Sequence, residues 1–96
     1  MRIAHIIMVH KNPEQLVRLI KRLKHPDADF YVHVDAKFNI DDFKSLSSFE
    51  QVFFIKNRVN CNWGGNTLFI GIITAMNEVL SLKKDYSFLN LRQNYM

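Results

Sequence analysis

Cysteine, proline and glycine are all scarce in this chain of 96 residues, and each scarcity excludes a class of protein. The single cysteine, Cys61, cannot form a disulfide within the chain, so this is not a disulfide-stapled mini-domain. Two prolines and three glycines exclude collagen-like and low-complexity chains. We expect Cys61 to be a small, partly buried apolar residue rather than a nucleophile.

Long hydrophobic runs are also missing. The apolar run from Ile3 to Val9 is interrupted by His5 and is too short for a signal peptide or a membrane-spanning helix. No other stretch approaches the length that is needed to cross a bilayer. The sequence therefore predicts a cytoplasmic location.

Hydrophobic residues are nevertheless abundant, at 48% of the chain, and they include eight Phe, three Tyr and one Trp. This composition excludes a disordered chain, and the length allows one small domain or part of a larger one. The formal net charge of +4 suits a phosphate-bearing ligand. No nucleic-acid partner is expected, because the basic residues within 18–24 fit the solvated face of an amphipathic helix and no helix-turn-helix or RNA-recognition motif is present.

Two hydrophobic periodicities alternate along the chain. Short β-rich runs predict strands, and apolar residues spaced three and four apart predict helices between them. This alternation predicts an α/β fold, a three-layer Rossmann-like parallel sheet with right-handed crossovers, and Asn12 is the expected N-cap of the first helix. The predicted strands are 3–9, 30–34, 51–55 and 86–91, the predicted helices are 13–24, 41–46 and 67–82, and residues 63–66 are a predicted tight loop.

The carboxyl ends of the first three predicted strands carry polar and basic residues, at 10–12, 35–37 and 56–58. Ligands of open parallel sheets bind beyond these ends, so we expect the ligand site there. A metal is not expected, because Asp35 lacks a second carboxylate two residues later and Lys37 stands in that place. A lysine repels a divalent cation and attracts a phosphate.

Other residues that carry chemistry have plain structural explanations. His5 and His33 lie inside predicted strands, where we expect hydrogen-bonded residues of the sheet rather than metal ligands. No G-x-G-x-x-G or G-x-x-x-x-G-K-[ST] motif is present, which argues against a Rossmann dinucleotide site and a P-loop. The pair Gly64-Gly65 fits a turn with positive φ and close approach of the backbone to a ligand equally well.

Four motifs occur together and in order along the chain. They are H-K-N-P-E-Q-L at 10–16, H-V-D-x-K at 33–37, R-x-x-x-x-W-G-G at 58–65 and D-Y-S-F-L-N-L at 85–91. From Ile3 to Leu91 the chain thereby resembles the core-2/I-branching N-acetylglucosaminyltransferase family, which also includes peptide O-xylosyltransferases.

The resemblance implies that residues 1–96 form a single partial domain, the N-terminal, nucleotide-sugar-binding portion of a GT-A glycosyltransferase fold. It implies inverting transfer of N-acetylglucosamine or xylose from a UDP-sugar to a glycan or protein acceptor, with no metal cofactor. Cations at the carboxyl ends of the strands suit a diphosphate. The residues implied to bind the nucleotide sugar are Val9, His10, Lys11 and Asp35 at the uridine, Lys37 and Arg58 as nearby cations, and Trp63, Gly64 and Gly65 in the loop that closes the donor pocket.

The chain departs from this family after Leu91, where the family continues with S-G-x-D-Y-P and this chain reads R-Q-N-Y-M. The family's general base lies in its later part, so no residue is assigned as catalytic and we expect no sugar transfer by residues 1–96 alone. The alternative is a non-catalytic nucleotide- or partner-binding module. A receiver-like signalling domain is set aside, because Lys11 and Lys56 stand where it would carry acidic residues.

Self-association is the last expectation. The predicted strand 86–91 would lie at the edge of the sheet, where unpaired backbone groups and apolar side chains favour pairing with another chain. The predicted helix 67–82 also exposes part of an apolar face. We therefore expect a homo-oligomer that forms through the strand or the helix.

Overall fold

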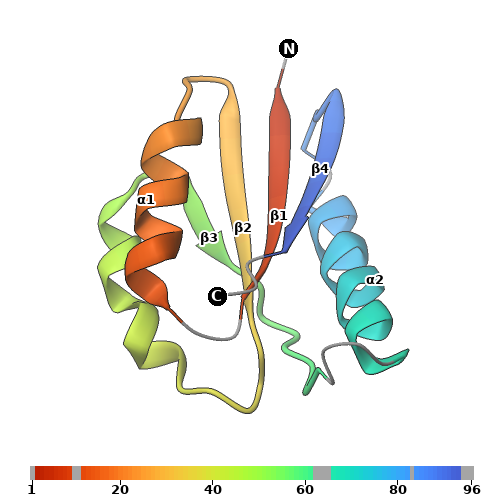
Figure 1. Ribbon diagram of the computed structural model, residues 1–96. Coiled ribbons are helices and arrows are strands. Elements are labelled where there is room, and N and C mark those ends of the chain that lie inside the picture. The colour runs from red at the N-terminus through yellow and green to blue at the C-terminus, as the bar shows by residue number, and fades with distance from the viewer. Residues whose placement is uncertain (1, 10–11, 62–65, 83, 94–96) are drawn as a thin grey trace.

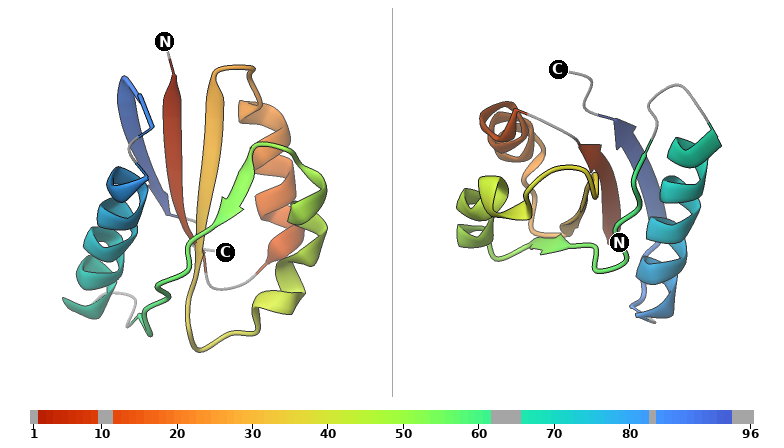
Figure 2. Two further views of the ribbon diagram at one scale, coloured as in Figure 1. Left: turned by 180° about the vertical axis from the view of Figure 1, so that it is seen from behind. Right: turned by 90° about the horizontal axis from the view of Figure 1, so that it is seen from below.

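The computed structural model describes residues 2–9, 12–61, 66–82 and 84–93. Figure 1 shows a sheet of parallel strands in the order β3-β2-β1-β4, with helices beside it. Helices α1 and η1 cover one face and α2 covers the other, as Figure 2 shows from below. This confirms the predicted three-layer, Rossmann-like α/β fold. The elements are β1 (Ile3–Val9), α1 (Pro13–Leu23), β2 (Ala28–Val34), the 3₁₀ helix η1 (Ile40–Ser48), β3 (Val52–Phe54), α2 (Asn66–Ser81) and β4 (Phe88–Gln93).

The two inner strands hold the core together. Every residue of β2 is buried, and so is every residue of β1 after the first, as expected for strands that are covered on both faces. Alternate side chains of β1 point to opposite faces: Ile7 packs with Leu16 and Ile20 of α1, whereas Ile6 packs with Ala75 of α2. The chain thus builds two hydrophobic clusters on one sheet.

The predicted helix 41–46 is corrected to the longer 3₁₀ helix η1, which bends at Phe43. The hydroxyl groups of Ser47 and Ser48 donate to carbonyl oxygens three residues earlier, at 2.7 and 2.9 Å. Serine side chains that bond the nearby backbone compete with α-helical hydrogen bonds. The side chain of Asn39 accepts the amide of residue 41 at 3.0 Å and begins the helix.

The N-terminus of α1 and its N-cap residue, Asn12, are as predicted, but the capping hydrogen bond is not made by the side chain. Asn12 precedes the helix with a φ of 60° and makes no capping bond with its side chain. Its carbonyl oxygen instead accepts the amides of Gln15 and Leu16, at 3.1 and 3.3 Å. Asparagine is one of the few residues that adopt the left-handed region readily, and Pro13 needs no hydrogen-bond acceptor there.

Strand boundaries also shift from the predicted ones. β2 begins at Ala28 instead of residue 30, and β3 is two residues shorter than the predicted strand 51–55, although the amide of Ile55 still donates to the carbonyl of β2 at 2.9 Å. Helix α2 runs from Asn66 to Ser81, so Asn66 of the predicted loop is helical, and the rest of that loop lies outside the described residues.

β4 begins at Phe88 rather than at Tyr86, whose amide donates to the carbonyl of Lys84 at 3.0 Å instead of to a neighbouring strand. The Tyr86 hydroxyl donates to Asp29 and lies 2.6 Å from the Tyr31 hydroxyl, and the Arg2 guanidinium binds the same Asp29 oxygen. Asp29 is 3% exposed, and burial raises the pKa of the Tyr86 hydroxyl. This cluster ties β4 to β2 at the amino-terminal end of the sheet, and sequence analysis gave it no role.

One flank of the molecule is apolar and exposed. It consists of the outer face of α2 and the edge strand β4, which lie side by side in Figures 1 and 2. No helix in the described part of the chain is long and apolar enough to span a bilayer. The predicted cytoplasmic location stays a prediction. The large side chains most exposed on this flank are Phe69, Ile70, Ile73, Leu80, Phe88 and Leu91, at 41–64% of their surface.

Self-association through this flank stays a prediction. We expect sedimentation at micromolar concentration to give a species larger than a monomer, because exposed apolar surface is stabilised by burial. Replacing Phe88 and Leu91 with lysine should dissociate an oligomer that forms through β4. Replacing Phe69 and Ile73 should dissociate one that forms through α2.

Leu89 is left unchanged in both variants because it packs against the core. A monomer for the unchanged chain would contradict the prediction. An oligomer that withstands both double substitutions would show that another surface is used.

Candidate functional site

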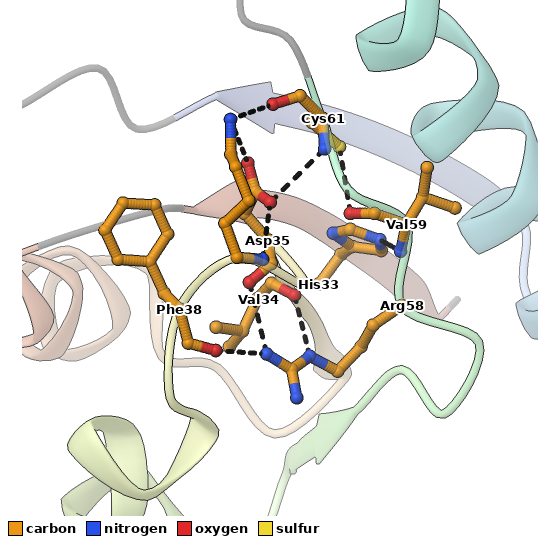
Figure 3. Close-up of polar contacts among 8 residues, drawn as sticks. His33, Val34, Asp35, Phe38, Arg58, Val59 and Cys61 are labelled. Atoms are coloured by element: carbon orange, nitrogen blue, oxygen red, sulfur yellow. Dashed lines mark hydrogen bonds and ion pairs between the residues drawn. The ribbon is translucent and has the colours of Figure 1, made fainter.

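The candidate site lies at the carboxyl ends of β1 and β2. The amide of Asp35 donates to the carbonyl of Val9 at 2.9 Å, so the ends of these two strands are adjacent, as the sequence predicts. Two further segments meet this end of the sheet. One is the turn at residues 35–38 that follows β2, and the other is the 55–61 segment that follows β3 (Figure 3).

Asp35 is the centre of this arrangement, and its side chain is fully buried. Its Oδ1 accepts the amide of Lys37 at 3.0 Å and the amide of Cys61 at 3.2 Å. Its Oδ2 lies 3.7 Å from the Lys37 ammonium. One carboxylate therefore joins the turn after β2 to the 55–61 segment, and its charge is compensated where water is excluded.

The Lys37 ammonium group is held in place on a side chain that is partly exposed. Its Nζ donates to the carbonyl of Cys61 at 2.6 Å, while 45% of the side chain remains exposed. An ammonium has three donors, so it can bind an external anion as well as its two partners in the protein. Lys37 therefore combines a held position with a partly exposed, positively charged side chain.

Arg58 faces the turn after β2. Its Nε donates to the carbonyl of Val34 at 2.9 Å, and its Nη2 donates to the carbonyls of Asp35, at 3.1 Å, and Phe38 (Figure 3). Sequence analysis placed this cation in the anion site. The structure gives it three carbonyl partners, so it also fixes the shape of the turn.

His33 is a buried acceptor rather than a ligand. Its Nε2 accepts the amide of Val59 at 2.9 Å, which requires a neutral ring with its hydrogen on Nδ1. Burial lowers the pKa of His33, and Arg58 acts in the same direction, whereas Asp35 and Glu78 oppose the shift. The predicted hydrogen-bonded role of His33 in the sheet is confirmed.

His5 is a buried residue of the sheet, as predicted, but its ring lacks the expected hydrogen bond among the described residues. Its ring stacks on Phe30 with centroids 5.0 Å apart, and its buried Nδ1 has no partner in the described part of the chain. Burial lowers the pKa of His5, and Arg92 adds to this shift.

Cys61 is buried as a small apolar residue, but fully rather than partly as predicted. It contacts α2 where that helix has its glycine. A Cβ atom on Gly71 would lie 2.8 Å from the Cys61 sulfur and 3.2 Å from the side chain of Met8. Burial and the neighbouring Asp35 raise the pKa of the thiol, which disfavours a nucleophilic thiolate. Gly71 therefore lets α2 approach the 55–61 segment closely.

Glu78 is a site residue that sequence analysis missed. It is the only charged residue of α2, and its two carboxylate oxygens accept the amides of Lys56, at 2.7 Å, and Asn57, at 2.9 Å. A single charge within a long apolar helix is the signal that was available. Its partners are backbone amides, which have no signature in a sequence.

Five predicted site residues, His10, Lys11, Trp63, Gly64 and Gly65, lie outside the described residues, and their roles stay predictions. The N-terminus of α1, which follows His10 and Lys11 in the sequence, borders a cavity of about 470 Å³. Its lining includes Asn12 and Arg18. Among the described residues, no three His, Cys, Asp or Glu side chains are grouped to hold a metal ion.

A parallel α/β sheet with charged residues at the carboxyl ends of its strands is typical of nucleotide-binding domains. Residues 3–94 match the family model Core-2/I-Branching enzyme, and the chain belongs to this family. It is 34% identical over 91 residues to a xylosyltransferase of Ciona intestinalis, covering 91% of this chain and 11% of that protein.

Other relatives carry similar names. Xylosyltransferase 1 of Rattus norvegicus is 29% identical over 85 residues, which cover 84% of this chain and 10% of the relative. Xylosyltransferase oxt of Drosophila pseudoobscura pseudoobscura is 28% identical over 99 residues, which cover 97% of this chain and 11% of the relative. The chain thus spans about a tenth of the length of the curated relatives it matches.

The contact between His33 and Val59 predicts a loss of stability in acid. The folded state disfavours the protonated ring, whereas the unfolded chain takes up a proton near the ordinary pKa of 6.5. The contribution of neutral His33 to the free energy of unfolding is therefore complete above pH 6.5 and declines as the pH falls below this value. Urea unfolding at about pH 7.5 and about pH 5.5 should show this decline.

The matched variant is His33→Gln, because a glutamine oxygen can accept the Val59 amide without titrating in this range. We expect it to lose less stability than the unchanged chain between the two pH values. Equal losses would show that His33 does not contribute to the decline.

Proposed function

We propose that this chain binds the nucleotide of a UDP-sugar as part of an inverting glycosyltransferase. The enzyme would transfer xylose or N-acetylglucosamine to a glycan or protein acceptor. The observation that carries the proposal is the pairing of the partly exposed Lys37 side chain with the buried Asp35 carboxylate at the carboxyl ends of β1 and β2. Membership of the Core-2/I-Branching enzyme family and the xylosyltransferase relatives support it.

Lys37 is suited to the diphosphate. It is held by the Cys61 carbonyl and by Asp35, so little reorganisation is needed when an anion arrives. During transfer the acceptor oxygen attacks the anomeric carbon opposite the UDP, the bond from that carbon to UDP breaks, and UDP gains negative charge. A cation held in place stabilises this charge as it develops.

We propose that donor binding needs no divalent cation. Asp35 is the acidic residue placed to hold one, but its charge already faces the Lys37 ammonium 3.7 Å away. Its Oδ1 accepts two backbone amides. A carboxylate with these partners is poorly suited to bind a metal ion, whereas the lysine beside it attracts phosphate.

A nucleotide-binding module without transfer activity is the second candidate. The attack requires a base to take the proton of the acceptor hydroxyl. Asp35 and Glu78 are the carboxylates that contact the 55–61 segment, and both are engaged by backbone amides. We therefore expect residues 1–96 to release no UDP from a UDP-sugar in the presence of an acceptor, in an assay for free UDP. Detectable turnover would contradict this and would identify a base within these residues.

UDP titration tests the proposed site. We expect UDP to bind weakly, at millimolar concentration, with the same affinity in the presence and absence of EDTA. Lys37→Ala should weaken binding about tenfold, because a charge-assisted bond to the diphosphate is lost. The matched control is Lys44→Ala on η1, whose side chain is exposed and lies 3.9 Å from Asp41, and it should leave the affinity unchanged.

Absence of UDP binding would overturn the proposed function. Equal loss of affinity in the Lys37 and Lys44 variants would indicate that UDP responds to overall charge rather than to this site. Binding that EDTA abolishes would overturn independence from a divalent cation.

A further inference from the structure

The backbone of the 55–61 segment is held by side chains from α2, from β2 and from the turn after β2. The amides of residues 56 and 57 bond to Glu78 of α2, at 2.7 and 2.9 Å. The amide of Val59 bonds to His33 of β2, and the amide of Cys61 bonds to Asp35 (Figure 3). Four backbone donors of an irregular segment therefore have side-chain acceptors, each of which fixes one point of its path.

The same segment sets the position of the exposed cation of the candidate site. The Cys61 carbonyl accepts the Lys37 ammonium at 2.6 Å, and the Val59 carbonyl accepts the amide of Ala36 at 3.1 Å. The Arg58 side chain spans from the segment to the carbonyls of the turn after β2. A shift of the 55–61 segment would therefore move the partners of Lys37.

Glu78 does not stabilise the helix in which it lies. It lies within the last turn of α2, where the negative end of the helix dipole disfavours an acidic residue. It is also the one charge in a helix that otherwise packs by apolar contacts. Two bonds to consecutive amides compensate this unfavourable placement, since hydrogen bonds to a charged group are stronger than neutral ones.

We infer that Glu78 is a positioning residue of the donor site, which acts through the 55–61 segment on Lys37. The inference rests on the proposed function in one respect, namely that the ligand held by Lys37 is the UDP diphosphate. Glu78 has no contact with that ligand in this assignment. It determines where the Cys61 carbonyl lies and thereby where the ammonium is held.

The experiment compares Glu78→Ala and Glu78→Gln with Asn77→Ala, an exposed neighbour on the same helix. Amide exchange followed by NMR reports on residues 56 and 57 without any ligand. We expect exchange at these two amides to accelerate at least tenfold in Glu78→Ala, because their acceptor is lost. Glu78→Gln keeps one oxygen acceptor and should give an intermediate rate. Asn77→Ala should leave these amides unchanged.

UDP titration of the same variants tests the link to the site. We expect UDP affinity to fall about tenfold in Glu78→Ala, less in Glu78→Gln and not at all in Asn77→Ala. The Cys61 amide resonance should shift in the same order. A role in stability alone would lower the melting temperature and leave the UDP affinity of the folded protein unchanged.

The outcomes separate this inference from the proposed function. If the unchanged chain binds UDP and Glu78→Ala binds it equally well with the two amides released, the inference is wrong and the function stands. If the unchanged chain binds no UDP, the proposed function is wrong. In that case a Cys61 amide resonance that shifts in both Glu78 variants still supports the coupling between Glu78 and Cys61. A Cys61 resonance that does not shift overturns this coupling. If Glu78→Ala does not fold, Glu78→Gln carries the same comparison.

Discussion

The buried carboxylate of Asp35 is the interaction on which the candidate site depends. A charge removed from water must be compensated by hydrogen bonds and an opposite charge, or the fold is destabilised by several kcal/mol. Here the compensation comes from two parts of the chain, the turn that carries Lys37 and the 55–61 segment that ends at Cys61. Both are therefore fixed at the carboxyl ends of the strands, and the exposed ammonium between them has a defined position.

Much of the fold could be predicted from the sequence, because hydrophobic periodicity reports directly on burial. The strands β1 and β2 and the helices α1 and α2 lie close to their predicted places, and the parallel order follows from their alternation. The errors lie where polar side chains make hydrogen bonds that periodicity does not report. Two serines of η1 donate to carbonyl oxygens three residues earlier, and the Tyr86 hydroxyl donates to Asp29 just before β4 begins. The partner of Tyr86 is 57 residues away in the sequence.

The candidate site could be predicted only in part. Asp35 and Lys37 are two residues apart and follow a clear strand, so their place at its end could be predicted from the pattern. The role of Glu78 and the hydrogen-bond partner of His33 could not be predicted, because each side chain accepts backbone amides of a segment that is 20 or more residues away. Any residue except proline supplies such an amide, so no residue type marks the partner.

The position of β1 in the sheet has a consequence for the newly made chain. β1 pairs with β2 on one side and with β4 on the other, and these partners are reached at residues 28 and 88. During synthesis one edge of the first strand thus stays without its partner until almost the whole described chain has left the ribosome. An unpaired apolar strand is a template for aggregation, and contacts between distant parts of a chain form slowly. Between these two pairings the free edge of β1 is open to pairing with another chain.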